Sequence, residues 1–266
     1  MSKLKKSINR IMSLEELTIL DTPIHRLHPA IKLLSTAIYL VMVISFGNEQ
    51  ISGLIVFFFY PVLLMALGEI PLKSLLSRLL IALPFTIFAG ISNLFVSREV
   101  VMYLGGAVIT KGMITFVAIL LKTLLSVSAV LILIATTSMN ELLYGMLYFH
   151  IPTILVMQIT MTFRYLGVLL GEVSVMYHAY ILRAPREKGI KLADMGPFLG
   201  QLIIRSFDRA ERIYQAMKCR GFEGGFHFSK RGKVPALQWT YLVILCGILL
   251  FLRFFNVSEF IGDLIV

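Results

Sequence analysis

The sequence predicts an all-α integral membrane protein with about five transmembrane helices plus amphipathic cytoplasmic helices, and a sixth span is an open alternative. Of the 266 residues, 58% are hydrophobic and 15% are charged, whereas soluble domains contain about 25% charged residues. Several apolar runs approach the roughly 20 residues that a membrane-spanning helix needs. The net charge of +10 lies mainly between these runs, which favours a membrane protein over a nucleic-acid-binding protein.

Five apolar segments are predicted to span the bilayer, because a helix satisfies its own backbone polar groups within lipid. They cover residues 31–46, 51–67, 79–96, 112–135 and 237–255, and a tight turn at 47–50 joins the first two. Lys122 lies within the fourth segment and has two interpretations. It makes a polar contact in a transport path, or it lies near the end of a span that begins later than residue 112.

The loop charges predict the orientation of the chain in the membrane. Residues 1–32, 69–78 and 138–235 contain 6, 2 and 13 lysines and arginines, together 21 of the 25. The positive-inside rule therefore places these segments in the cytoplasm, with the N-terminus inside and the C-terminus outside. The first residues lack the apolar run and cleavage site of a signal peptide, so we expect them to be retained.

The region between the fourth and fifth spans is predicted to contain several helices. Ser138 and Glu141 have the spacing of a capping box, and the helix that they start is expected to end near residue 149, before Pro152. The run 154–182 is apolar at first, so a sixth span at 154–170 stays open. A long amphipathic helix at or below the bilayer is favoured by three polar residues within it, Gln158, Arg164 and Glu172.

The clearest amphipathic element is a helix predicted from Phe198, after Pro197, to Arg220. Apolar residues recur every three or four positions, which places them on one face of a helix. Asp208 and Arg212 are one turn apart and could form an ion pair worth about 0.3–0.5 kcal/mol. Gly221 follows the helix, where a glycine readily adopts the left-handed conformation that ends helices.

No catalytic, cofactor-binding or metal-ligating residue is expected in this chain. It has no phosphate-binding loop of the Walker type, no H-E-x-x-H motif and no paired Asp-rich motif. Cys219 and Cys246 fall in a charged segment and an apolar span, so a disulfide is not expected. His25 and His28 are three residues apart, a spacing that metal ligands use, but their position before Pro29 favours ordinary polar contacts.

Several motifs in a fixed order resemble one known family. They are Thr22–Leu33 before the first span, Ala135–Ser138 at the end of the fourth, Phe163–Tyr165, the helix end Leu182–Ala184, and Arg205–Phe222. Together they resemble the transmembrane T component of energy-coupling factor (ECF) transporters over nearly the whole chain. The pattern Arg-Ala-Glu-Arg-Ile-Tyr-x-Ala-Met-x-x-Arg-Gly-Phe, from Arg209 to Phe222, is most similar to the CbiQ/NikQ branch for cobalt or nickel uptake.

The resemblance implies a role for two helix ends, at Leu182, Arg183 and Ala184 and at Cys219, Arg220 and Gly221. In that family, Ala-Arg-Gly-like motifs on cytoplasmic coupling helices insert into grooves on two ABC-type ATPase subunits. Both triplets here keep the arginine but depart from Ala-Arg-Gly at other positions. The family's Asp-Pro-Arg-x-Lys appears as His28-Pro-Ala-Ile-Lys32, so that only the proline and Lys32 are retained.

The resemblance also implies the partners and the function. The chain is expected to pass ATP-driven motion to a cobalt- or nickel-binding membrane subunit of the CbiM/NikM type, in a prokaryotic cytoplasmic membrane. ATP and Mg²⁺ would be bound by the ATPases, so this chain is expected to be no enzyme and to hold no cofactor. A T component of a vitamin transporter, a membrane enzyme and a self-sufficient channel are the alternatives.

The predicted organisation of the chain has three parts. Residues 1–137 form the N-terminal cytoplasmic segment and the first four spans, 138–235 form the coupling-helix region, and 236–266 form the last span. The lipid bilayer and protein subunits are the expected partners, and nucleic acid is not.

Overall fold

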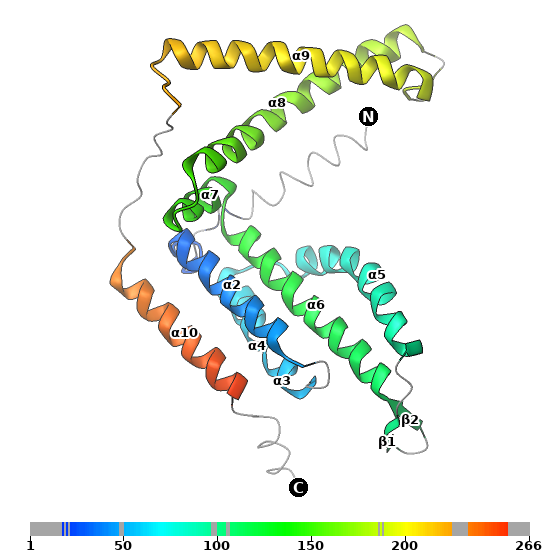
Figure 1. Cartoon of the computed structure of the whole chain (residues 1–266), viewed down its shortest axis with the longest axis vertical. Helices are drawn as coiled ribbons and strands as arrows, with labels where there is room; N and C mark the ends of the chain where they lie inside the picture. The colour runs from blue at the N-terminus through cyan, green and yellow to red at the C-terminus, as the bar shows by residue number, and fades with distance from the viewer. Residues whose placement is uncertain are drawn as a thin grey trace. The chain divides into compact units, whose positions relative to one another are not determined.

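The computed structural model describes residues 18, 20, 22–47, 51–96, 100–104, 107–185, 187, 189–224 and 234–254. Most of these residues are helical (Figure 1), as the predicted fold class requires. The contacts divide the chain into two compact units, Met1–Gly145 with Gly232–Val266, and Met146–Arg231. The N-terminal segment before residue 18, most of the predicted turn at 47–50 and the tail after residue 254 lie outside the described residues.

The first unit is built around two helices, α2 (Pro29–Ser45) and α6 (Lys111–Thr136). The helices α3 (Ile51–Val56), α4 (Phe59–Gly68) and α5 (Leu72–Val96) pack against α6, and α10 (Ala236–Phe254) packs against α2. Between α5 and α6, the strands β1 (Val100–Leu104) and β2 (Ala107–Thr110) form a short antiparallel ribbon. The buried core includes Tyr39, Leu54, Leu125 and Ile132.

The second predicted span is broken into α3 and α4 at Phe57 and Phe58. The carbonyl of Phe57 accepts from the N–H of Tyr60 at 3.4 Å, a long bond that leaves room for a second donor. The hydroxyl of Tyr39 donates to the carbonyl oxygen of Phe57 at 3.0 Å, and its ring stacks on Tyr60 with 4.3 Å between the centroids. The predicted helical segment at 51–67 is therefore present with one irregular turn at Phe57 and Phe58, where Tyr39 supplies an additional donor.

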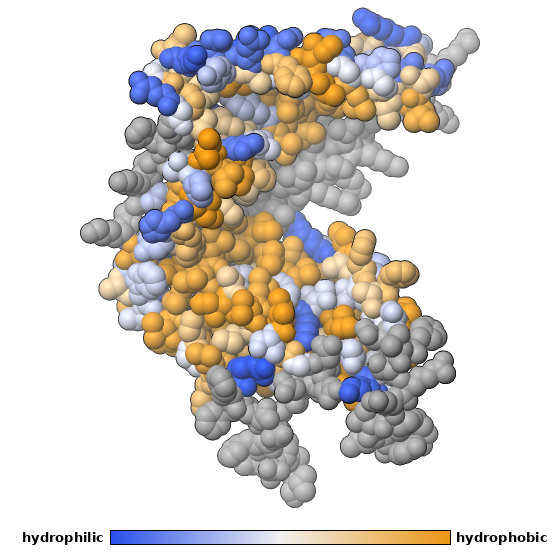
Figure 2. Space-filling model, in the orientation of Figure 1, coloured by the Kyte–Doolittle hydropathy of each residue, from blue (hydrophilic) through white to orange (hydrophobic). Residues whose placement is uncertain are grey.

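Within the described residues, four helices are long and apolar enough to cross a membrane. The segments are Leu75–Ser92, Lys111–Thr136, Thr153–Arg183 and Ala236–Arg253, while Pro29–Ser45 and Gly53–Gly68 are shorter apolar helices. The face of the first unit seen in Figure 2 is largely apolar where it is coloured, and Phe85 and Phe88 on α5 are 85% and 82% exposed. Such large exposed apolar surfaces are typical of a protein that faces lipid.

The second unit contains the two long helices α8 (Thr153–Arg183) and α9 (Leu192–Cys219). The helix α7 (Met139–Tyr148) precedes them. The backbone N–H of Ser138 donates to Glu141 Oε2 at 3.3 Å, and the N–H of Glu141 lies 3.4 Å from Ser138 Oγ. This reciprocal pair confirms the predicted capping box at the start of α7.

The helix α9 begins six residues earlier than the sequence predicted. It starts at Leu192, and Pro197 lies inside it. A proline removes one backbone hydrogen bond, but it fits the helical φ angle and is best tolerated near a helix start. Asp194 lies in the first turn, where a carboxylate interacts favourably with the helix dipole. The predicted start after Pro197 was therefore wrong.

Candidate functional site

The end of α9 presents Arg220 on a well-defined cap. The N–H of Phe222 donates to the carbonyl of Met217 at 3.1 Å, and the N–H of Gly221 donates to that of Lys218 at 3.0 Å. These two bonds are those of a Schellman motif, which needs a left-handed residue at its centre. Gly221 has a φ of +79°, as the sequence predicted. Cys219 and Arg220 are exposed directly before this turn.

The end of α8 presents Arg183 on a different cap. The helix ends at Arg183, and the N–H of Ala184 donates to the carbonyl of Tyr180 at 3.0 Å. Ala184 has a φ of −125°, so the residue that follows α8 is not left-handed, unlike Gly221 after α9. Leu182 is 82% exposed and Arg183 is exposed. Both predicted arginines thus lie at exposed helix ends, with different backbone geometry.

The connection between α8 and α9 is fixed by polar contacts around Tyr180. The hydroxyl of Tyr180 donates to Asp194 Oδ2 at 2.7 Å, and the N–H of Lys191 donates to the Tyr180 oxygen at 3.3 Å. Lys191 pairs with Glu187 at 2.8 Å, and its hydrogen bond to this carboxylate raises the pKa of Lys191. These contacts hold the last turn of α8 next to the first turn of α9.

Glu172 joins the two long helices further along their length. Its two carboxylate oxygens accept from Arg205 Nη1 at 2.6 Å and from Arg209 Nη2 at 3.1 Å. Arg205 and Arg209 are one helical turn apart, so both reach the same carboxylate. Within the described residues, the arginines of α9 that form ion pairs are these two, and the predicted pair of Asp208 with Arg212 is not among the pairs.

A groove of about 390 Å³ lies between α8 and α9 near their connected ends. It is lined by side chains of both helices, which include Met176, Arg183, Asp194, Phe198 and Arg205. The groove places Arg183 beside the first turns of α9. Arg220 lies at the other end of that helix, whose 28 residues span about 42 Å at 1.5 Å per residue. The two arginines are therefore too far apart to enter one common pocket.

One face of α9 exposes large apolar side chains. Leu199, Ile203 and Phe207 are 49%, 55% and 72% exposed, and hydrophobic and hydrophilic patches alternate over this helix in Figure 2. The amphipathic pattern that the sequence predicted is therefore present, and its apolar face is uncovered in the single chain. An uncovered apolar face of this kind marks a site of protein or membrane contact.

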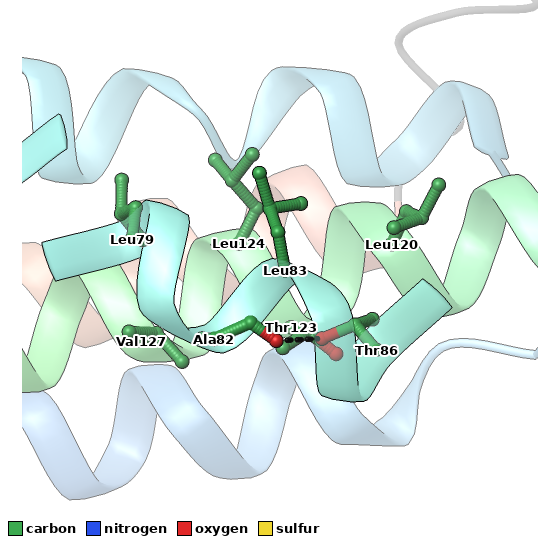
Figure 3. Close-up of a pocket in the computed structure, with 8 residues that line it drawn as sticks. All are labelled: Leu79, Ala82, Leu83, Thr86, Leu120, Thr123, Leu124 and Val127. Carbon is green, nitrogen blue, oxygen red and sulfur yellow. Dashed lines mark hydrogen bonds between the residues drawn. The ribbon is translucent and has the colours of Figure 1, made fainter. Parts of the chain in front are cut away.

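The gap between α5 and α6 is too small for a substrate (Figure 3). Its volume is about 10 Å³, which is close to the minimum for a single water molecule. The hydroxyl of Thr86 points to its own helix, where it donates to the carbonyl of Ala82 at 3.0 Å. The remaining lining residues are Leu79, Leu83, Leu120, Thr123, Leu124 and Val127. This gap is a packing space between helices.

Glu172 and Tyr180 were not recognised as part of the site from the sequence. In the sequence, Glu172 is a polar residue on one predicted helix, and the arginines of α9 form the charged face of another. The signal that could have joined them was the one-turn spacing of Arg205 and Arg209, which suits a shared carboxylate. Which carboxylate this is depends on how α8 and α9 pack, and three acidic residues on α9 itself were closer in sequence.

Comparison with known proteins places the chain in a family of transport proteins. The family described as CbiQ, cobalt transport protein, matches residues 21–235. An EcfT energy-coupling factor transporter transmembrane protein of Bacillus subtilis is 25% identical over 256 residues, covering 86% of this chain and 94% of that protein. An uncharacterized protein of Methanocaldococcus jannaschii is 25% identical over 250 residues, with 90% and 84% covered. The nickel permease LarQ of Lactiplantibacillus plantarum is 32% identical over 93 residues, about a third of each chain.

Proposed function

The chain belongs to the CbiQ family of cobalt transport proteins, and from this premise we propose that it is the transmembrane T component of an ECF importer for cobalt or nickel. In this role it passes the ATP-driven movement of two ABC-type ATPase subunits to a membrane subunit that binds the metal ion. The observation that carries the proposal is the family match over residues 21–235, which includes both exposed arginine ends.

Arg183 and Arg220 are the residues proposed to dock the ATPases. Each lies at an exposed helix end, from which a planar guanidinium can form paired hydrogen bonds with a carboxylate. Leu182 and Ala184 flank the first arginine, and Cys219 and Gly221 flank the second. The length of α9 between them, about 42 Å, favours one ATPase at each end over a single ATPase that binds both.

The contacts of Glu172 and Tyr180 support movement of this region as one body. A carboxylate shared by two arginines and a fixed connection link α8 to α9. A pull on either arginine would therefore move both helices, as rigid-body coupling requires. The exposed apolar face of α9 is the proposed contact surface for the metal-binding membrane subunit.

The cobalt or nickel substrate is proposed from two comparisons. The family description names cobalt, and LarQ is named a nickel permease. The proposed orientation has the N-terminus and both arginine ends in the cytoplasm of a prokaryotic cell, where ATP is available. Under this orientation α8 does not cross the bilayer, although its length and composition would allow it.

Co-purification with the ATPases tests the docking role. The chain is co-expressed with ABC ATPase subunits and the double variant Arg183→Glu, Arg220→Glu is compared with the natural chain. Arg164→Glu, Arg212→Glu is the matched control, because it makes the same charge change at exposed positions on the same two helices. We expect the ATPases to be lost from the first variant and retained by the second.

Two results would contradict the proposal. One is equal retention of ATPase by the double variant and the control, and the other is no retention by the natural chain when the ATPases are well folded.

Uptake of radiolabelled Co²⁺ and Ni²⁺ by the complete complex then tests the substrate. Uptake of a vitamin in place of either ion would assign the chain to the vitamin-transporting branch.

A further inference from the structure

The N-terminal end of α2 contacts three other helices of the first unit. The backbone N–H of His28 donates to Oε1 of Gln238 in the first turn of α10 at 2.8 Å. The ring of His28 accepts from the N–H of Ala30 at 3.2 Å through Nδ1, and it meets the ring of Tyr144 on α7 edge-on, with 5.9 Å between centroids. One residue thus caps α2 and contacts both α7 and α10.

Lys32 fastens the end of α6 to the same place. Lys32 is only 4% exposed. Its ammonium donates to the carbonyl of Thr136 at 2.7 Å and to the carbonyl of His25 at 3.1 Å. Thr136 is the last residue of α6, where the carbonyl groups carry the negative end of the helix dipole. A buried ammonium is costly without such partners, so Lys32 holds α6 specifically against α2.

Gly145 brings the backbone of α7 directly onto α2. A Cβ atom at this position would lie 2.7 Å from Leu33 Cδ1, 3.2 Å from the Ala30 nitrogen and 3.2 Å from the Pro29 carbonyl carbon. Contacts of 3.2 Å to backbone atoms cannot be relieved by a rotamer change. A side chain at this position would therefore push the backbones of α7 and α2 apart by a few tenths of an ångström.

Along the chain, the described segments of the first unit that border the second unit are α7 and the start of α10, and both contact this end of α2. The boundaries fall after Gly145 and after Arg231, so one connection leaves through α7 and the other returns through the start of α10. Tyr144 and Gly145 lie on the first connection, and Gln238 lies just after the second. Movement that is passed along the chain from the second unit therefore reaches the first unit at α2 by either route.

We infer that the N-terminal end of α2 is the mechanical joint through which movement of α8 and α9 enters the membrane helices, with Lys32 and Gly145 as positioning residues. The joint is defined by His28, Lys32, Gly145 and Gln238. This inference rests on the proposed function, because it names the route of the coupling that the ATPases drive.

The test measures coupling separately from assembly. The complex with its ATPases and metal-binding subunit is reconstituted in vesicles, and ATP hydrolysis and the uptake of radiolabelled Co²⁺ and Ni²⁺ are recorded together. Gly145→Ala is compared with Gly247→Ala, an open position on α10, and Lys32→Met with Lys73→Met, an exposed lysine. We expect ions transported per ATP to fall about tenfold in the two joint variants, a typical coupling effect, while the controls match the natural chain.

The possible results separate the inference from the proposed function. Joint variants that assemble and keep the natural ratio of ions to ATP would overturn the inference. Loss of assembly in both would also overturn it, since the joint would then serve folding and not coupling. If the natural chain retains no ATPase or shows no ATP-dependent uptake of either ion, the proposed function fails instead. Normal ATP hydrolysis with lost uptake in Gly145→Ala alone would support the inference even if Lys32→Met does not assemble.

Discussion

The ammonium of Lys122, in the middle of α6, donates to the carbonyl oxygen of Phe46 at 2.7 Å. Phe46 is the residue that caps the C-terminal end of α2. The last carbonyls of a helix have no partner within it, so Lys122 supplies the Phe46 carbonyl with a donor from another helix. Arg253 on α10 donates to the neighbouring carbonyl of Ser45 at 2.9 Å, and its guanidinium lies 4.2 Å from the Phe46 ring centroid. α6 begins at Lys111, well before Lys122, and the two interpretations of this lysine stay predictions.

Replacing Lys122 should therefore destabilise the membrane helices. The variant Lys122→Met keeps the length of the side chain and removes its donor, which should cost about 1–2 kcal/mol of stability. Thermal unfolding in detergent measures this effect, with the exposed Lys73→Met as the control. An unfolding temperature equal to that of the control would mean that the bond to Phe46 contributes little.

Gly221 should be required for ATPase docking, because the turn that it forms sets the direction in which the chain presents Arg220. Its φ of +79° costs a residue with a Cβ atom about 1–2 kcal/mol, so Gly221→Ala should loosen the Schellman motif. We expect ATPase affinity to fall roughly fivefold to tenfold, as measured by titration of ATPase on the purified chain. Gly200→Ala, at an open position within α9, should bind as the natural chain does, and equal affinities for both variants would contradict the role of the cap.

Glu172 should hold α9 against α8 through Arg205 and Arg209. The variant Glu172→Gln keeps the shape of the side chain and removes its charge. Amide hydrogen exchange in α9 near Arg205 and Arg209 should then become faster by a factor of roughly two to five, because exposed ion pairs contribute little stability. The same factor should appear in the natural chain at high salt. Glu211→Gln, an exposed carboxylate on α9, is the control. In a double-mutant cycle of Glu172→Gln with Arg209→Ala, effects on exchange free energy that simply add would exclude an interaction between the two residues.

Arg183 and Arg220 should act independently because of their separation. Sites about 42 Å apart along α9 share no partner, and effects at such distances add. Each single variant to glutamate should therefore retain one ATPase, and the double variant none, when the complexes are weighed by native mass spectrometry. Loss of both ATPases from either single variant would instead indicate that the ATPases bind only as a pair.

Local signals in the sequence were enough for the five apolar helical segments, for the start of α7 and for the end of α9, but not for the start of α9 or for the β1–β2 ribbon. The apolar runs predicted helices in all five expected spans, since length and composition decide whether a segment is stable in lipid. Ser138 with Glu141 and Gly221 after Arg220 marked a helix start and a helix end, because caps depend on residues within one or two turns. The ordered motifs also indicated the family, which the match over residues 21–235 confirms.

Contacts between distant residues were decided only by the tertiary structure. The bond from Tyr39 to the turn between α3 and α4 joins residues 18 apart, and Lys122 reaches a carbonyl 76 residues away. Glu172 meets Arg205 and Arg209 across 33 and 37 residues. No periodicity specifies such pairs, because they follow from the packing of whole helices, which sets the atoms that a side chain can reach.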